Sequence, residues 1–226
     1  MRVVPIVLSL ALFGCDSGSS PPPPLPPPPV ITGSLAMDPN SWDIQFSREQ
    51  PPHPLGVPEG WYFDFSLEPV NFDCNSNPTC GAIHYITQPR YGKMAGTAMV
   101  MMFNVVSSGS PVYQYKLKPD NTCESAATVR LFFQGNAGDN RWWSNPAAGI
   151  LKSGMQTLLT PLDDPSKWSN AGGIYGNQAA VMFEAAKSGV ARIGMTFGGG
   201  CFFGHGVNVL EGSGTSRFIA TKFMIQ

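Results

Sequence analysis

Apolar and polar residues alternate along several short segments of this chain, and this period of two constrains the fold more than any other feature. Neighbouring side chains of a β-strand point to opposite faces, so the alternation predicts strands with one buried face. The segments with this pattern are residues 128–134, 191–197 and 216–226, and residues 61–65 and 82–87 are also predicted to be strands. Residues 93–106 are apolar on both faces, which predicts a single central strand that is fully buried.

One helix is predicted late in the chain. Asn177 can cap it, residues 178–187 are mostly good helix formers, and Gly189 can end it. Its apolar face is expected to consist of Val181, Met182, Ala185 and Ala186. A shorter helical turn is expected where Asp164 can act as a cap and Pro165 follows at the first helical position.

Many short strands, with turn-forming residues between them and one or two short helices, predict an all-β fold. The expected architecture is a two-sheet antiparallel jelly-roll sandwich over residues 41–226. In the last strand, the alternation places Ile219, Thr221, Phe223 and Ile225 together on one face.

The first residues have the three parts of a secretory signal. Arg2 supplies a positive start, residues 3–13 form an apolar run, and Gly14 precedes Cys15. The run is too short for a transmembrane helix, which needs about 20 apolar residues. Leu12-Phe13-Gly14-Cys15 resembles the lipobox of bacterial lipoproteins. This resemblance implies that residues 1–14 are a signal peptide and that Cys15 is lipidated.

Residues 15–40 are expected to form a tether between the lipid and the sandwich. Residues 21–29 are eight prolines and one leucine, which favour a polyproline II spacer of roughly 28 Å. The expected location is therefore the cell envelope, on the periplasmic face of the inner or outer membrane or at the cell surface. The lipid anchor is the only membrane contact expected.

Charged side chains make up only 13% of the chain, and the net charge is −1. Because no basic run is present, nucleic acid is not an expected partner. Neutral polar groups must supply much of the exposed surface, as in many exported β-proteins and sugar-binding surfaces.

Four cysteines follow Cys15, and an even number in an exported chain predicts disulfides with three alternative connectivities. A turn-forming stretch separates Cys74 from Cys80, so a local disulfide between them is one option, which leaves Cys123 with Cys201. Metal binding is the rival interpretation, but the spacings typical of zinc sites do not occur.

Aromatic and planar polar residues gather in two segments that are candidates for ligand binding. The first contains Arg141, Trp142, Trp143 and Asn145, and the second contains Trp168 and Asn170. A flat ring can lie under the apolar face of a sugar while arginine and asparagine bind its hydroxyl groups. If Trp142 and Trp143 lie on a strand, one is expected in the core and the other on the opposite face. The alternative is that all three tryptophans belong to the core.

A glycine-rich segment, residues 198–206, contains His205 between two glycines. The segment is interpreted either as an irregular sheet edge or as a binding loop that places His205 at the mouth of a pocket. No cofactor is expected. Asp163 and Asp164 together could coordinate a structural Ca²⁺ ion, although capping explains Asp164 equally well.

The order of these segments from Arg141 to the C-terminus resembles domains of the galactose-binding-like jelly-roll type found in secreted bacterial proteins. The resemblance implies that carbohydrate is the expected class of ligand. The leading hypothesis is therefore a non-catalytic carbohydrate-binding lipoprotein.

Two other functions remain open. An enzyme that acts on polysaccharides is the second hypothesis, although no carboxylate pair indicates a glycosidase. A lyase would use His84 or His205 as its base and Arg141 to neutralise a uronate. The third hypothesis is a surface protein-interaction or assembly module, which an exposed apolar patch without a pocket would favour.

Overall fold

The computed structural model describes residues 26–70, 81–115, 126–138, 140–145, 149–200 and 203–226. The predicted signal peptide, the lipidation site at Cys15 and the cysteines of the predicted disulfides lie outside these residues. The described chain folds into two main sheets and a small third one, which confirms the prediction of an all-β sandwich.

The larger sheet has the strand order β1-β7-β15-β10-β11-β14, with β3 beside β7 and β12 beside β10. Its strands are β1 (Val30–Ile31), β3 (Asp43–Gln45), β7 (Tyr85–Met94), β10 (Ala127–Gly135), β11 (Arg141–Ser144), β12 (Gly149–Ile150), β14 (Trp168–Asn170) and β15 (Val190–Gly199). All of these pairings are antiparallel except that of β1 with β7.

The smaller sheet has the order β13-β8-β17-β5-β4, with β2 beside β17. Its strands are β2 (Gly33–Ser34), β4 (Leu55–Val57), β5 (Gly60–Asp64), β8 (Ala98–Gly109), β13 (Gly154–Pro161) and β17 (Gly214–Ile225). The third sheet consists of β6 (Leu67–Glu68), β16 (Val207–Leu210) and β9 (Tyr113–Tyr115). Strands β1 and β2 lie in the segment assigned to the tether, and both pair with central strands.

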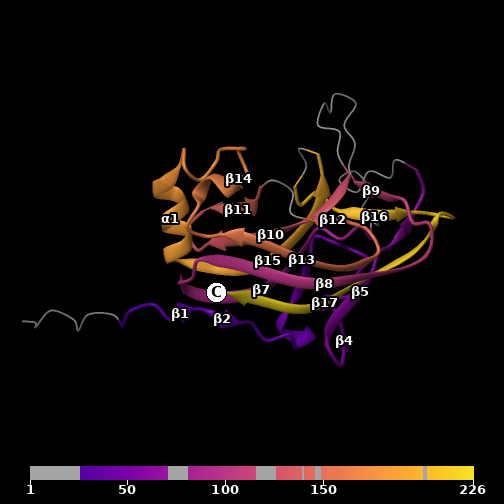
Figure 1. Ribbon diagram of the computed structural model, residues 1–226, viewed down its shortest axis with the longest axis horizontal. Coiled ribbons are helices and arrows are strands. Elements are labelled where there is room, and N and C mark those ends of the chain that lie inside the picture. The colour runs from indigo at the N-terminus through magenta and orange to yellow at the C-terminus, as the bar shows by residue number, and fades with distance from the viewer. Residues whose placement is uncertain (1–25, 71–80, 116–125, 139, 146–148, 201–202) are drawn as a thin grey trace, which may run out of the picture.

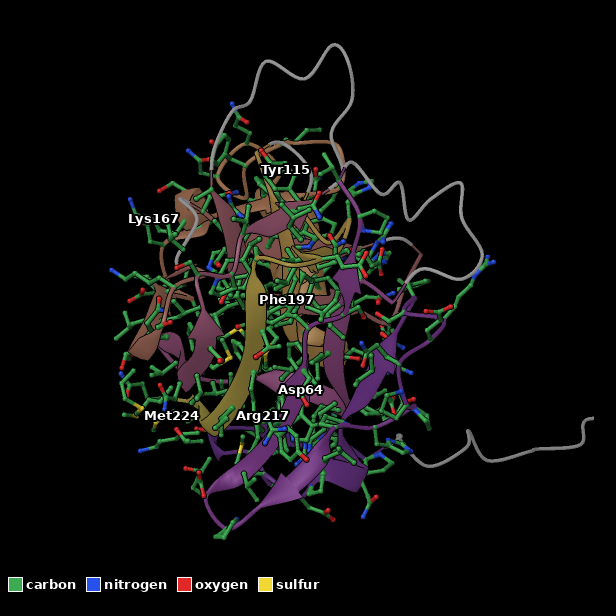
Figure 2. The ribbon with its side chains drawn as sticks, turned by 90° about the vertical axis from the view of Figure 1, so that its right-hand side faces the viewer. Asp64, Tyr115, Lys167, Phe197, Arg217 and Met224 are labelled. Carbon is green, nitrogen blue, oxygen red and sulfur yellow. The ribbon has the colours of Figure 1, made fainter. Side chains whose placement is uncertain are left out.

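The main core lies between the two large sheets and is rich in aromatic rings. Phe197 of β15 meets Phe218 of β17 edge to face at 5.3 Å, and Phe218 stacks on Phe103 of β8 at 4.6 Å. Figure 2 shows Phe197 in the middle of the molecule. These contacts bury alternate residues of both sheets, as the period of two requires.

Helix α1 (Ala180–Ser188) closes one end of the sandwich, and the small sheet of β9 and β16 lies at the other end (Figure 1). Of the predicted apolar face of this helix, Ala186 is buried, but the prediction is wrong for Val181, which is 86% exposed, and for Met182 and Ala185, while Phe183 is fully buried. Phe183 turns toward the core because Trp142 and Trp168 lie there as packing partners. The helix starts without a side-chain cap, so the predicted role of Asn177 is also wrong.

Short helical turns occur at η1 (Pro39–Ser41) and η2 (Pro165–Lys167). The side chain of Asp164 accepts a hydrogen bond from the backbone N–H of Ser166, which confirms its predicted capping role. Within the described part of the chain, no helix combines the length and apolar character needed to cross a membrane.

Two strand predictions need correction. Residues 93–106 are not one strand, because the chain turns after Met94 and passes from β7 in the larger sheet to β8 in the smaller one. Gly96 permits this turn, since a Cβ there would lie 2.6 Å from the carbonyl oxygen of Gln226. In β17 the register shifts between Ala220 and Lys222, so Phe223 and Ile225 share the buried face with Phe218 and Ala220, and not with Ile219 and Thr221 as predicted.

Candidate functional site

Strand β11 sends its two tryptophans to opposite faces of the larger sheet, as predicted. Trp142 lies opposite Phe133 of β10 and belongs to the main core, whereas Trp143 lies opposite Phe132. Trp143 and Phe132 form a second cluster with Tyr85 of β7, against which Phe203 packs. We call these four residues the outer cluster, and the face that carries them the outer face.

The prediction of ligand-binding roles is wrong for Trp142 and Trp168. Both are fully buried in the main core and have no exposed surface. Their indole nitrogens are also used inside the protein, because Trp142 Nε1 donates to Asn140 Oδ1 at 2.7 Å and Trp168 Nε1 donates to the Pro161 carbonyl at 2.6 Å. Their burial follows from contact with Phe183 of α1.

Two cavities adjoin the outer cluster, and they share Tyr85, Arg141 and His205. The smaller cavity has a volume of about 220 Å³ and is also lined by Trp143, Asn170, Ala171, Gly173 and Phe203. The larger cavity has a volume of about 400 Å³ and is also lined by Phe46, Arg48, His84 and Gly204. Four of the predicted site residues, Arg141, Trp143, Asn170 and His205, therefore come together here.

Arg141 and Trp143 lie on the same side of β11 because they are two residues apart. The Arg141 guanidinium carbon lies 5.7 Å from the centre of the Trp143 ring, a distance typical of a cation–π contact. Asn170 reaches the smaller cavity from the end of β14, and its Oδ1 accepts hydrogen bonds from the backbone N–H groups of Gly172 and Ile174. Its amide thus holds the turn that forms one wall of the cavity.

Asn145 lines neither of these two cavities, and its contact with a ligand stays a prediction. Its Oδ1 accepts a hydrogen bond of 2.6 Å from Arg130 Nη1, and its Nδ2 donates to Ser169 Oγ. Arg130 is buried on the outer face and lies 3.6 Å from the centre of the Phe203 ring. Burial lowers the pKa of Arg130 to about 10, so its guanidinium still carries a positive charge at neutral pH. This charged network supports the floor beneath Phe203.

His84 lies in the wall of the larger cavity and is 9% exposed. Burial lowers the pKa of His84 to about 4, and the nearby His205 contributes to the same shift. At neutral pH the imidazole is therefore uncharged. Gly206 lies against it so closely that a Cβ there would be 2.3 Å from His84 Nε2, and the φ of Gly206 is +93°. This position requires glycine.

Several buried polar atoms around the outer face have no hydrogen-bond partner among the described residues. They are His84 Nε2, Arg130 Nε, Trp143 Nε1 and Thr196 Oγ1. Thr196 lies on β15 between Tyr85 and Arg130 in the sheet register. Buried polar groups are normally paired. Trp61 Nε1, Ser107 Oγ and Asn208 Nδ2, whose side chains line neither cavity, also have no partner among the described residues.

Some lining residues carried no signal in the sequence. Phe46 has a φ of 64°, a conformation that is unfavourable for a bulky residue, and its ring is 69% exposed. The ring meets Tyr85 edge to face at 5.5 Å. Arg48 follows on the same loop. Phe46 and Arg48 line the larger cavity together with Arg141 because the folded chain places their loop beside β7.

No protein-family model matches the chain, and comparisons with curated proteins and with solved structures also give no match. Among the residues that the structure describes, no three histidine, cysteine, aspartate or glutamate side chains gather in a way that would hold a metal ion. The site must therefore be interpreted from its own geometry.

Proposed function

We propose that this protein is a non-catalytic carbohydrate-binding lipoprotein and that the sugar lies over the outer cluster. The observation that carries the proposal is the junction of two cavities at Tyr85, Arg141 and His205. Aromatic rings and planar polar groups meet there, which is the combination that a sugar ring requires. The proposed anchor is lipid on Cys15, and the proline-rich segment would hold the domain away from the membrane.

A glycan array with the full-length protein tests this function. We expect binding to one class of glycan, accompanied by a change in tryptophan fluorescence. Arg141→Ala should abolish most of the binding, because Arg141 lines both cavities. Arg217→Ala is the matched control, since Arg217 lies on the smaller sheet and pairs with Asp64. Silence of a folded protein on neutral and acidic glycans would refute carbohydrate binding and favour an interaction module.

The anchor is tested separately by cell fractionation. The wild-type protein should be found in the membrane fraction, and Cys15→Ser should release it or leave it unprocessed. A wild-type protein that is fully soluble and lacks an acylated N-terminus would contradict the proposed anchor without affecting the sugar site.

A polysaccharide lyase is the second candidate, because His84, Arg141 and His205 line the same cavity. In a β-elimination, a base removes the C5 proton of a uronate, the C4–O bond breaks and a C4=C5 double bond forms. The leaving oxygen then takes a proton from an acid. A His84 with a pKa of about 4 is a weak base at neutral pH, which favours binding over this reaction. The unsaturated product absorbs ultraviolet light, so its appearance with acidic polysaccharides would decide for the lyase.

A further inference from the structure

The two cavities adjoin each other rather than forming separate sites. Tyr85, Arg141 and His205 belong to the walls of both, so a ligand in one cavity is in contact with the boundary of the other. Each cavity also has an aromatic ring of its own, Trp143 in the smaller one and Phe46 in the larger one. This arrangement provides two consecutive places for rings of a chain-like ligand.

The walls of these cavities carry positive and no negative side chains among the described residues. The positive groups are the guanidinium groups of Arg48 and Arg141, and His84, which is uncharged at neutral pH, and His205 add imidazoles. Guanidinium groups bind carboxylates and sulfates through paired, charge-assisted hydrogen bonds. An anionic ligand therefore matches the walls better than a neutral one does.

Two other surface hollows differ from these cavities because their walls include carboxylates. One contains Asp38 and Glu59, so its walls are acidic. Another contains Arg217 together with Asp64, to which Arg217 donates through Nε and Nη2 at 2.7 and 2.9 Å. Figure 2 shows Asp64 and Arg217 close together. Both of these hollows have a carboxylate in their walls, whereas the lining of the two cavities at the outer face contains none.

Two buried polar atoms belong to side chains that line the cavities. Trp143 is 3% exposed and His84 is 9% exposed, and neither Trp143 Nε1 nor His84 Nε2 has a hydrogen-bond partner in the described chain. One such atom belongs to each cavity. Ser107 Oγ, in the wall of another hollow, and Trp61 Nε1, in the main core, also lack a partner among the described residues, so the unpaired atoms accompany the cavities without defining them.

We infer that the ligand is an acidic polysaccharide, and that an internal stretch of it lies across both cavities, with its carboxylate or sulfate groups against Arg48 and Arg141. This inference rests on the proposed carbohydrate binding and specifies its ligand. The smaller cavity receives one sugar unit beside Trp143, and the larger cavity receives a neighbouring unit beside Phe46.

Calorimetry with the full-length protein tests the inference through charge and chain length. The ligands are the monosaccharide, disaccharide and tetrasaccharide of a polyuronate, of a sulfated glycan and of a neutral glucan. We expect the acidic tetrasaccharide to bind at least about tenfold more tightly than the neutral one, and its affinity to fall as salt is added. The tetrasaccharide should also bind about tenfold more tightly than the monosaccharide. The polyuronate and sulfate series identify which anion the arginines recognise.

Two variants address the cavities individually. Ala171→Trp places a large ring in the smaller cavity, and Ala180→Trp on the exposed start of α1 is its control. Phe46→Gly removes the ring from the larger cavity, and Tyr91→Ala is its control because Tyr91 is similarly exposed and lines neither cavity. Each site variant should weaken tetrasaccharide binding about tenfold, while each control should bind like the wild type.

The outcomes separate this inference from the function on which it rests. Equal affinity for neutral and acidic chains would overturn the inference and leave carbohydrate binding intact, and so would equal affinity for monosaccharide and tetrasaccharide. Loss of binding in only one site variant would overturn the two-cavity arrangement. No binding of any sugar by the folded protein would refute the proposed function itself.

Discussion

The two faces of the larger sheet are both lined by buried aromatic rings, but they differ in how their polar atoms are satisfied. On the inner face, the indole N–H groups of Trp142 and Trp168 donate to acceptors at 2.7 and 2.6 Å. On the outer face, Trp143 Nε1, Arg130 Nε and Thr196 Oγ1 have no partner among the described residues. The indole donors on the inner face of the larger sheet are therefore paired, although Trp61 Nε1 of the smaller sheet, in the same main core, also has no partner among the described residues.

The difference in hydrogen-bond pairing between the two faces indicates which residues stabilise the fold and which are available for a ligand. A core that exists only for stability gains from pairing every polar atom, because an unpaired buried donor costs about 1–3 kcal/mol. Incomplete pairing is tolerated where a site needs the groups for a ligand. We therefore expect changes on the inner face to act on folding, and changes on the outer face to act mainly on binding.

The largest expected effect is on the inner face, at Phe183. Its ring lies within 5.1 Å of Trp142 and 5.7 Å of Phe133, measured between ring centres. Phe183→Ala should lower the free energy of unfolding by about 3–5 kcal/mol, because it leaves a cavity among these rings. Val181→Ser, on the exposed side of the same helix, should change it by less than about 0.5 kcal/mol. Urea unfolding of both variants measures the difference, and equal effects would contradict the assignment of the two helix faces.

Replacement of each neighbouring tryptophan by phenylalanine compares the two faces directly. Trp142→Phe removes a paired donor and leaves Asn140 Oδ1 without it, so the free energy of unfolding should fall by about 2 kcal/mol. Trp143→Phe removes a donor that has no partner, so the cost should stay below about 1 kcal/mol. Denaturant midpoints at one pH test this order. A larger loss for Trp143→Phe would show that the outer face is as important to stability as the inner one.

The outer face should also make stability depend on pH. His84 has a pKa of about 4 in the folded protein and about 6.5 when unfolded, so the unfolded chain binds more protons between these values. The contribution of the neutral His84 side chain to the free energy of unfolding is therefore fully present above pH 6.5, and it is lost as the pH falls toward 4. At pH 5 it should be about 2 kcal/mol smaller than at pH 7.5. The measurement is urea unfolding at both pH values, with His84→Gln as the comparison. Identical pH dependence in the two proteins would contradict this role of His84.

Local sequence patterns predicted those parts of the fold that local geometry determines. Uninterrupted alternation over residues 128–134 and 191–197 corresponds to β10 and β15. The prediction failed at Thr221, because a bulge after Ala220 reverses the alternation without any change in residue type. It failed again at Val181, because a short helix with apolar residues on several sides can turn only one of them toward the core.

The candidate site was predictable in part for the same reason. The alternation of side chains along a strand already implied that Trp142 and Trp143 point to opposite faces of the sheet. It did not predict which of the two faces packs against the core. That choice depends on strand order, since β7, β15, β10 and β11 become neighbours only in the folded sheet. The same strand order places Tyr85 of β7 and Arg141 of β11 in the walls of the same two cavities. Phe46 gave no signal, because its unusual backbone conformation and its contact with Tyr85 exist only in the folded chain.

The smallest stability effect, and the sharpest separation of stability from binding, is expected for Phe46→Gly. Glycine adopts a φ of 64° without steric cost, which should recover about 1 kcal/mol. Two effects should offset this gain in the free energy of unfolding by a similar amount. The variant loses the edge contact with Tyr85, and glycine gives the unfolded chain more conformational freedom. The free energy of unfolding should therefore change by less than about 1 kcal/mol, while affinity for the acidic tetrasaccharide falls about tenfold. The backbone of Phe46 is strained and its side chain is exposed, so a role in binding explains why the ring is present although it does not stabilise the fold. If Phe46→Gly instead binds normally and unfolds more easily, the ring supports the loop and the larger cavity has no subsite beside it.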